Sequence, residues 1–284
     1  MIQPRKPMAK IFAVANQKGG VGKTTTTVNL AAALAALKQR VLLIDLDPQG
    51  NATMGSGIDK RTLPTSVYQL LLGLQPLASI RKRSETGRYD VLPANRELAG
   101  AEIDLVEMEH RETRLRAALA PYLAEYDFVL IDCPPALSLL TLNGLTAAQG
   151  VIIPMQCEYY ALEGLSDLVN TIKQVHRNLN PELEIIGLLR VMFDPRSTLA
   201  NQVSSQLESH FGDKVFKTLV PRNIRLAEAP SYGMPGVVFD KSSKGALAYV
   251  AFGAEMVERF KLHLPEASGS GPSPAPADAT MANA

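Results

Sequence analysis

The stretch Lys18-Gly19-Gly20-Val21-Gly22-Lys23-Thr24-Thr25 decides the fold of this chain. It follows a short apolar run, Ile11–Ala15, and precedes a segment rich in alanine and leucine, Val28–Leu37. A strand, a glycine-rich turn and a helix in this order form the setting in which a phosphate-binding loop works. Glycines bring backbone N–H groups close to an anion, and the helix that follows adds the positive end of its dipole. We therefore expect this stretch to bind the phosphates of a nucleotide.

Two side chains of the loop have the chemistry that a bound nucleotide requires. Lys23 can reach the β- and γ-phosphates, and the hydroxyl of Thr24 is placed to ligate Mg²⁺. The usual loop begins with glycine, but Gln17 stands at that position here, and a second lysine, Lys18, opens the loop instead. The pattern favours a variant phosphate loop over a solvated turn.

Composition limits the classes of protein to consider. The chain has 284 residues, of which 46% are hydrophobic, so one large α/β domain can bury a substantial core. A net charge of +1 gives no global basic field, so any nucleic-acid surface has to be local. Cys133 and Cys157 have no metal-ligand spacing, which favours buried structural thiols in a reducing compartment. Without an apolar leader or a run of about 18 apolar residues, we expect a cytoplasmic protein that does not enter membranes.

Apolar runs and helical patterns alternate along the chain. The expected strands are Ile11–Ala15, Arg40–Asp45, Tyr89–Pro93, Tyr126–Asp132, Gly150–Gln156, Glu184–Met192 and Val215–Val220. The expected helices are Val28–Leu37, Thr65–Leu74, one or two solvated helices over Glu97–Ala120, Leu162–Leu179 and Ser242–Leu262. This alternation predicts an α/β fold, a doubly wound and mostly parallel sheet with helices on both faces.

Two of these strands run into carboxylates at the edge where parallel sheets bind ligands. Asp47 follows the strand that ends at Asp45, and it is the candidate to orient or activate an attacking water. Asp132 ends another apolar strand, the pattern of a residue that holds Mg²⁺ through a water. The segment after it, Cys133–Leu140, is a candidate switch that senses the γ-phosphate.

The longer string from Asn16 to Leu30, with Asp45-Leu46-Asp47-Pro48-Gln49-Gly50-Asn51, resembles the ParA/MinD ATPases and is most similar to the ParA/Soj chromosome-partitioning ATPases. The resemblance covers residues 10 to about 262 and implies a P-loop NTPase fold of the SIMIBI type that uses ATP and Mg²⁺. It implies that Lys18, Lys23 and Asp47 are catalytic, and that Lys18 reaches across a homodimer interface to the nucleotide of the partner.

The resemblance also assigns residues to the base and to DNA. Pro221 and Asn223 map onto residues near the adenine ring, and Arg196 and Arg225, with Arg222, onto residues that hold the DNA backbone. Between residues 190 and 244 there are eight Lys or Arg against five Asp or Glu, a small excess that a solvated face explains equally well. Contacts to phosphates would make DNA binding independent of sequence and sensitive to salt.

The expected function is an ATP-dependent DNA-partitioning switch. Its ATP-bound dimer binds double-stranded DNA non-specifically, a ParB-type partner stimulates its slow hydrolysis, and it associates with the nucleoid. One alternative is a ParA-like ATPase that positions another cargo, such as a chemoreceptor, flagellar or polar complex. Others are a metabolic member of the superfamily, such as an amidoligase or a dethiobiotin synthetase-like enzyme, and a nucleotide-binding module without turnover. A MinD-like division-site regulator is disfavoured because residues 266–284 contain no Lys or Arg. We expect a flexible extension over residues 1–9, the ATPase domain over 10–264 and a disordered tail over 265–284.

Overall fold

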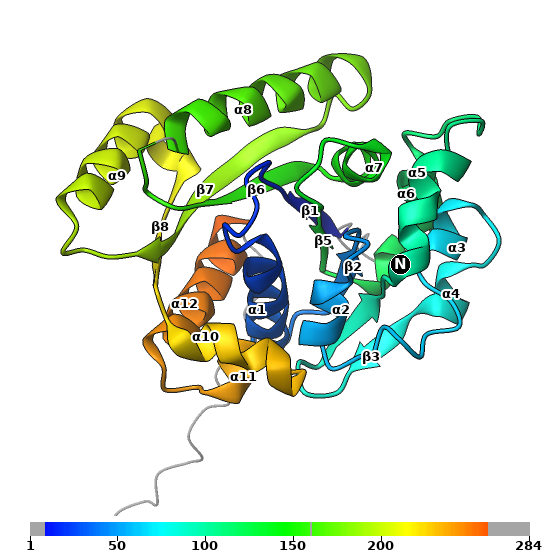
Figure 1. The fold of residues 1–284 in the computed structure, drawn as a ribbon, viewed down its shortest axis with the longest axis horizontal. Coiled ribbons are helices and arrows are strands. Elements are labelled where there is room, and N and C mark those ends of the chain that lie inside the picture. The colour runs from blue at the N-terminus through cyan, green and yellow to red at the C-terminus, as the bar shows by residue number, and fades with distance from the viewer. Residues whose placement is uncertain (1–8, 160, 261–284) are drawn as a thin grey trace, which may run out of the picture.

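A single eight-stranded sheet forms the centre of the computed structural model, which describes residues 9–159 and 161–260 (Figure 1). The strand order is β3-β4-β2-β5-β1-β6-β7-β8, and every neighbouring pair is parallel except β3 and β4. The strands are β1 (Lys10–Val14), β2 (Val41–Asp45), β3 (Lys82–Ser84), β4 (Tyr89–Leu92), β5 (Phe128–Asp132), β6 (Gly150–Met155), β7 (Glu184–Phe193) and β8 (Val215–Pro221). The predicted α/β fold with a doubly wound, mostly parallel sheet is confirmed.

Helices cover both faces of this sheet. The α-helices are α1 (Lys23–Ala36), α2 (Asn51–Gly55), α3 (Val67–Leu71), α4 (Leu77–Ile80), α5 (Ala101–Asp104), α6 (Arg114–Leu119), α7 (Leu139–Ala147), α8 (Ala161–Asn178), α9 (Thr198–Phe211), α10 (Ile224–Glu228), α11 (Gly236–Phe239) and α12 (Lys244–Arg259). Short 3₁₀ helices lie at η1 (Arg96–Gly100), η2 (Ala120–Glu125), η3 (Gly212–Lys214) and η4 (Ala229–Tyr232). Helices α1 and α12 pack side by side on one face, while α7, α8 and α9 lie on the other (Figure 1).

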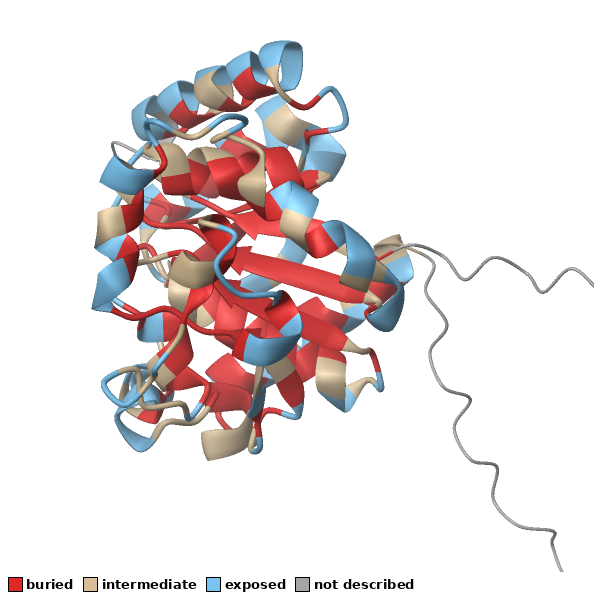
Figure 2. Cartoon of the chain, turned by 90° about the vertical axis from the view of Figure 1, so that its right-hand side faces the viewer, coloured by how far each residue is buried: buried red, intermediate tan, exposed pale blue. Residues whose placement is uncertain are grey.

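The two faces of the sheet enter two separate hydrophobic cores. In β1, Phe12 and Val14 pack with α1 and α12, whereas Ile11 and Ala13 pack with the helices of the opposite face. This follows from the strand period of two, and it explains why the central strands are apolar throughout. Figure 2 shows buried strands between helices whose outward surfaces are exposed.

The parallel arrangement brings the carboxyl ends of seven strands, all except β3, to one edge of the sheet. Asp45 at the end of β2 is in register with Asp132 at the end of β5, and Val14 at the end of β1 is also in register with Asp132. The glycine-rich loop follows β1 directly. Segments far apart in the sequence therefore meet where the sequence predicts the site.

Some sequence predictions differ from the structure. Residues 97–120 form η1, α5 and α6, with turns between α5 and α6. Leu98, Leu105 and Leu115 are buried in the core although Ile103 is exposed, so the prediction of one or two solvated helices there was wrong. The charged stretch Arg81–Arg88 contains the antiparallel edge strand β3, and α2, α7 and α9 were not predicted. The predicted extension (1–9) lies, apart from residue 9, outside the described residues, as does the predicted tail (265–284).

Candidate active site

The glycine-rich loop takes a backbone path that only glycine adopts easily. Gly20 and Gly22 have φ angles of +72° and +81°, in the left-handed region where a Cβ is unfavourable. Gly22 is the N-cap of α1, and no side chain caps this helix end. The N–H groups of the first turn are therefore available to an anion.

The two lysines of the loop lie in different environments. The side chain of Lys23 is buried, and its Nζ donates a hydrogen bond to the carbonyl oxygen of Lys18 at 3.1 Å. Burial lowers the pKa of Lys23, and the negative charges of Asp132 and Asp47 oppose this effect. The Lys18 side chain is 51% exposed, and its Nζ lies 2.7 Å from Oε2 of Glu158, which is equally exposed. Lys23 thus lines a cavity beside the phosphate loop, whereas Lys18 lies outside this cavity, at its rim.

Thr24 and Asp132, which the sequence predicts to hold magnesium, are in direct contact. The Thr24 hydroxyl donates to Oδ2 of Asp132 at 2.7 Å, and the Thr27 hydroxyl donates to Oδ1 at 3.1 Å. Burial raises the pKa of Asp132, and the neighbouring Asp45 raises it further. A hydroxyl and a carboxylate are oxygen ligands that suit Mg²⁺. No cluster of three His, Cys, Asp or Glu side chains within the described residues could hold a metal alone, so a cation here would also need phosphate and water oxygens.

Asp45, at the end of β2, holds the loop that carries Asp47. Its Oδ1 accepts a hydrogen bond from the backbone N–H of Asp47 at 3.1 Å. Its Oδ2 accepts from both the N–H and the hydroxyl of Thr53, at 2.8 and 2.7 Å. Burial raises the pKa of Asp45 although these hydrogen bonds lower it. Asp47 itself lines the cavity next to the phosphate loop.

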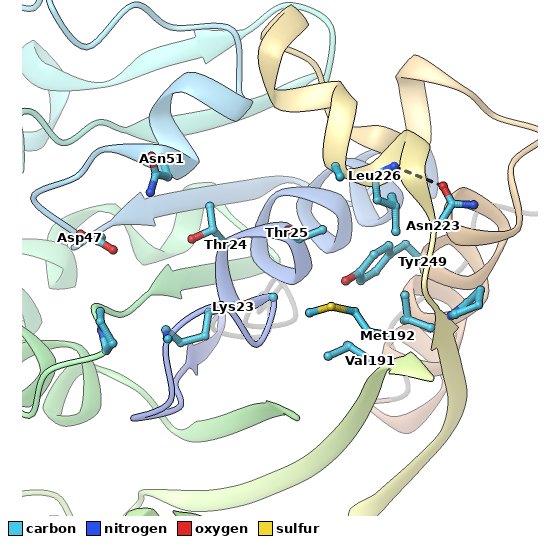
Figure 3. A pocket seen from close by; sticks show the side chains of 17 residues that line it. Lys23, Thr24, Thr25, Asp47, Asn51, Val191, Met192, Asn223, Leu226 and Tyr249 are labelled. Carbon is cyan, nitrogen blue, oxygen red and sulfur yellow. Dashed lines mark hydrogen bonds between the residues drawn. The ribbon is translucent and has the colours of Figure 1, made fainter. Parts of the chain in front are cut away.

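A cavity of about 380 Å³ joins the phosphate loop to the end of β8, a size typical of small-molecule sites (Figure 3). The predicted Pro221 and Asn223 line it, and the Asn223 side chain also caps α10 by accepting from the Leu226 N–H at 3.2 Å. Pro135 lines it from the predicted switch segment, and the lining residues that the sequence did not predict are Asn51, Val191, Met192, Val220, Leu226, Ala227 and Tyr249. Asn51, Leu226 and Ala227 lie next to residues with a predicted role, whereas Val191, Met192, Val220 and Tyr249 come from segments without a motif, so only the fold identifies these four.

The predicted switch segment borders the same cavity. Pro135 lines it, and the carboxylate of Glu102 on α5 accepts hydrogen bonds from the Leu139 and Leu140 N–H groups at the start of α7, at 3.1 and 3.3 Å. Cys133 opens the segment, and its thiol is free and buried, as is that of Cys157. Burial raises the pKa values of both thiols.

The three arginines predicted to hold DNA are exposed at the same edge of the sheet, Arg196 and Arg222 on loops and Arg225 on α10. The Arg196 side chain is 88% exposed and pairs with Asp194 at 3.0 Å. Arg225 pairs with Glu228 at 2.9 Å and with Asp240 at 3.4 Å, and Arg222 lies between the end of β8 and α10. None of the three lines the nucleotide-sized cavity. Their position is compatible with a separate binding surface.

None of the helices within residues 9–159 and 161–260 has the length and apolar character needed to cross a lipid bilayer.

Comparisons with known proteins identify the family. A family profile described as an AAA domain matches residues 9–185. The chromosome partitioning protein ParA of Myxococcus xanthus is 50% identical over 252 residues, which cover 89% of this chain and 89% of that protein. The sporulation initiation inhibitor protein Soj of Bacillus subtilis is 51% identical over 249 residues, covering 88% and 98%.

A solved structure has the same fold over nearly its whole length. The crystal structure of cobyrinic acid a,c-diamide synthase from Mycobacterium smegmatis, with bound ADP and magnesium, has a TM-score of 0.80 and 40% identity. The match covers 90% of this chain and 96% of that chain. The sequence relatives named ParA and Soj are more similar in sequence than this structure. The chain belongs to the ParA/Soj family of chromosome-partitioning ATPases.

Proposed function

We propose that this chain is an ATP-dependent DNA-partitioning switch. It hydrolyses ATP with Mg²⁺, its ATP-bound homodimer binds double-stranded DNA without sequence preference, and a ParB-type partner stimulates hydrolysis and so releases the DNA. One observation carries the proposal. A single cavity is lined by Gly19–Gly20, Gly22–Thr25, Asp47, Pro221 and Asn223, in a chain about half identical to ParA and Soj.

Each element of this cavity has a role in phosphoryl transfer. The loop N–H groups and Lys23 bind the phosphates, and Lys23 exchanges its hydrogen bond with the Lys18 carbonyl for one with a phosphate oxygen. Thr24 and Asp132 would hold magnesium, which neutralises charge on the phosphates when bound. Asp47, fixed through Asp45, orients the attacking water.

Lys18 supplies the coupling between ATP and dimerisation. In the isolated chain its ammonium group lies at the rim on Glu158, outside the position that Lys23 occupies. A lysine at the rim can neutralise the phosphates of a second subunit when the two rims face each other. Since one lysine organises the transferring phosphoryl group less strongly than a bidentate arginine, we expect slow turnover in isolation.

DNA binding follows from the exposed arginines. Arg196, Arg222 and Arg225 provide three phosphate contacts in each chain and therefore six in a dimer. Six contacts give a slope of about −5 for the logarithm of the affinity against the logarithm of the salt concentration. Affinity should then fall about a thousandfold for a fourfold rise in salt. A monomer with three contacts would lose binding at much lower salt, so DNA binding depends on the ATP dimer.

Three variants separate the proposed steps. Lys23→Ala should abolish ATP binding, Lys18→Ala should bind ATP but stay monomeric, and Asp47→Ala should bind ATP and dimerise without hydrolysing it. Lys173→Ala, an exposed lysine on α8, is the matched control and should behave like the wild type. Calorimetry, sedimentation and phosphate release measure the three steps. Dimerisation of Lys18→Ala at wild-type strength, or hydrolysis by Asp47→Ala, would contradict the assignment.

An amide-forming synthase is the second candidate function. The 40% identical structure named a cobyrinic acid a,c-diamide synthase favours it, together with a second cavity of about 420 Å³ beside the first. Asn29, Met54, Ser231 and Met234 line this second cavity, and Thr24 and Thr25 border both. Stimulation of ATP turnover by cobyrinic acid with glutamine, and not by DNA, would favour the synthase. The positioning of another cargo would share the chemistry of the switch and differ only in the partner.

A further inference from the structure

We propose that Met192 is a nucleoside-binding residue, on whose thioether the base of the bound nucleotide packs, and that Gln156 fixes its position. The inference rests on the proposed function, because it assumes that ATP binds in this cavity. It assigns a role to two residues that no sequence motif indicates.

The backbone of Met192 is strained at the edge of the cavity. Its φ angle is +51°, in the left-handed region that costs free energy for a residue with a Cβ. The other described non-glycine residues with positive φ, Lys38, Arg88 and His110, all lie in turns, whereas Met192 lies in β7. Strain that persists within a strand beside a cavity points to a function for that residue.

This conformation places two consecutive side chains in one cavity. In a regular strand, neighbouring side chains point to opposite faces of the sheet. Val191 and Met192 nevertheless both line the cavity, close to Tyr249 (Figure 3). The positive φ of Met192 breaks the alternation and directs its thioether to the same side as Val191. The strain therefore has a direct consequence for the shape of the site.

The Met192 side chain lies between the phosphate loop and the far end of the cavity. A Cβ placed on Gly22 would be 3.9 Å from Cε of Met192, so the methyl group lies next to the start of α1. Gln156, just after β6, donates from Nε2 to Sδ of Met192 at 3.0 Å and to the Gly20 carbonyl at 3.5 Å. Gln156 thus links the phosphate loop to the thioether. Met192 therefore lies in the cavity beside the phosphate loop, and its polarisable sulfur is well suited to contact an aromatic base.

Two substitutions separate the strain from the contact. Met192→Ala removes the side chain and keeps the strain, and Met192→Gly removes both. We expect both variants to bind ATP about tenfold more weakly than the wild type, with Met192→Leu much closer to it. Without nucleotide, Met192→Gly should melt at a higher temperature than Met192→Ala. Gln156→Ala should weaken ATP binding less, since the thioether is still present.

Binding of inorganic tripolyphosphate distinguishes a contact between Met192 and the nucleoside from a general structural effect of the substitution. It has the phosphates without a nucleoside, so the affinity of Met192→Ala for it should equal that of the wild type. Lys38→Gly relieves a strained turn after α1, away from the cavity, and should raise the melting temperature without changing ATP affinity. Calorimetric titrations of each variant with ATP and with tripolyphosphate, in the presence of Mg²⁺, measure these affinities.

The possible failures are distinguishable. If the wild type does not bind ATP, the proposed function fails and this inference fails with it. If the wild type binds ATP and Met192→Ala binds it equally well, only this inference is overturned. A parallel loss of ATP and tripolyphosphate binding in Met192→Ala would also overturn it, because the defect would then lie in the phosphate loop.

Discussion

The ion pair between Lys18 and Glu158 predicts how the monomer resists dimerisation. The Nζ and Oε2 atoms lie 2.7 Å apart within one chain. For Lys18 to reach the nucleotide of a partner, this pair has to open. Glu158→Gln keeps the size of the side chain and removes its charge, so it should favour the dimer.

The exposure of the two side chains determines how much this ion pair contributes to the free energy of the monomer. Both side chains are 51% exposed, and an exposed ion pair contributes about 0.5 kcal/mol. A dimer opens two such pairs, which makes about 1 kcal/mol, or about a fivefold tighter dimer for Glu158→Gln. The difference from the wild type should shrink at high salt, because exposed charges are screened.

Sedimentation equilibrium with a non-hydrolysable ATP analogue and Mg²⁺ measures the dissociation constant of the dimer directly. Glu125→Gln is the matched control, because Glu125 pairs with Arg81 at 2.6 Å with similar exposure but precedes β5, at the opposite edge of the sheet. Its dimer should have wild-type strength. A weaker dimer for Glu158→Gln would refute the reasoning and place Glu158 among the groups that stabilise the dimer.

Three further predictions concern packing, thiol reactivity and DNA. In Gly187→Ala the new Cβ would lie 2.7 Å from the buried ring of Phe216, so the free energy of unfolding, measured with heat or urea, should fall by about 1–3 kcal/mol. In the control Gly164→Ala the new Cβ meets nothing within 4 Å, so the free energy of unfolding should not fall. Burial raises the pKa of Cys157 to about 11, so at pH 8 about one thiol in a thousand is ionised. Alkylation of Cys157 in the native chain, followed by mass spectrometry, should therefore be slow, and its rate should rise about tenfold for each pH unit. Rapid labelling at neutral pH would contradict this. Arg225→Ala removes two contacts from a dimer and should reduce the salt slope of DNA binding by about 2, and an unchanged slope would exclude Arg225 from the DNA surface.

The central strands could be predicted because parallel strands buried on both faces are continuous apolar runs. Strand β3 could not, because its charged residues are stabilised by pairing with β4 and by the ion pair of Arg83 with Asp90 at 2.8 Å. Helix α9 has a mixed polar sequence, and its start depends on the Ser197 hydroxyl, which accepts from the Ala200 N–H at 3.2 Å. Such elements depend on tertiary contacts and short caps more than on periodicity.

The same distinction holds for the site. The loop from Lys18 to Thr25 and the carboxylates at or just after strand ends, Asp132 and Asp47, lie in local patterns whose chemistry can be predicted from the sequence. Met192 and Glu158 lie in segments about 170 and 140 residues from the loop, without a motif, and the sheet brings them to it. Backbone strain at Met192 and the pairing of Glu158 are visible only in three dimensions.

The central claim is that ATP controls DNA binding. Retention of non-specific duplex DNA by the purified chain, compared with ATP, with ADP and without nucleotide at low and moderate salt, tests it most directly. We expect the chain to retain DNA with ATP alone, and to lose this retention at moderate salt and in Lys18→Ala. Equal retention in all three nucleotide states, or none in any, would contradict it.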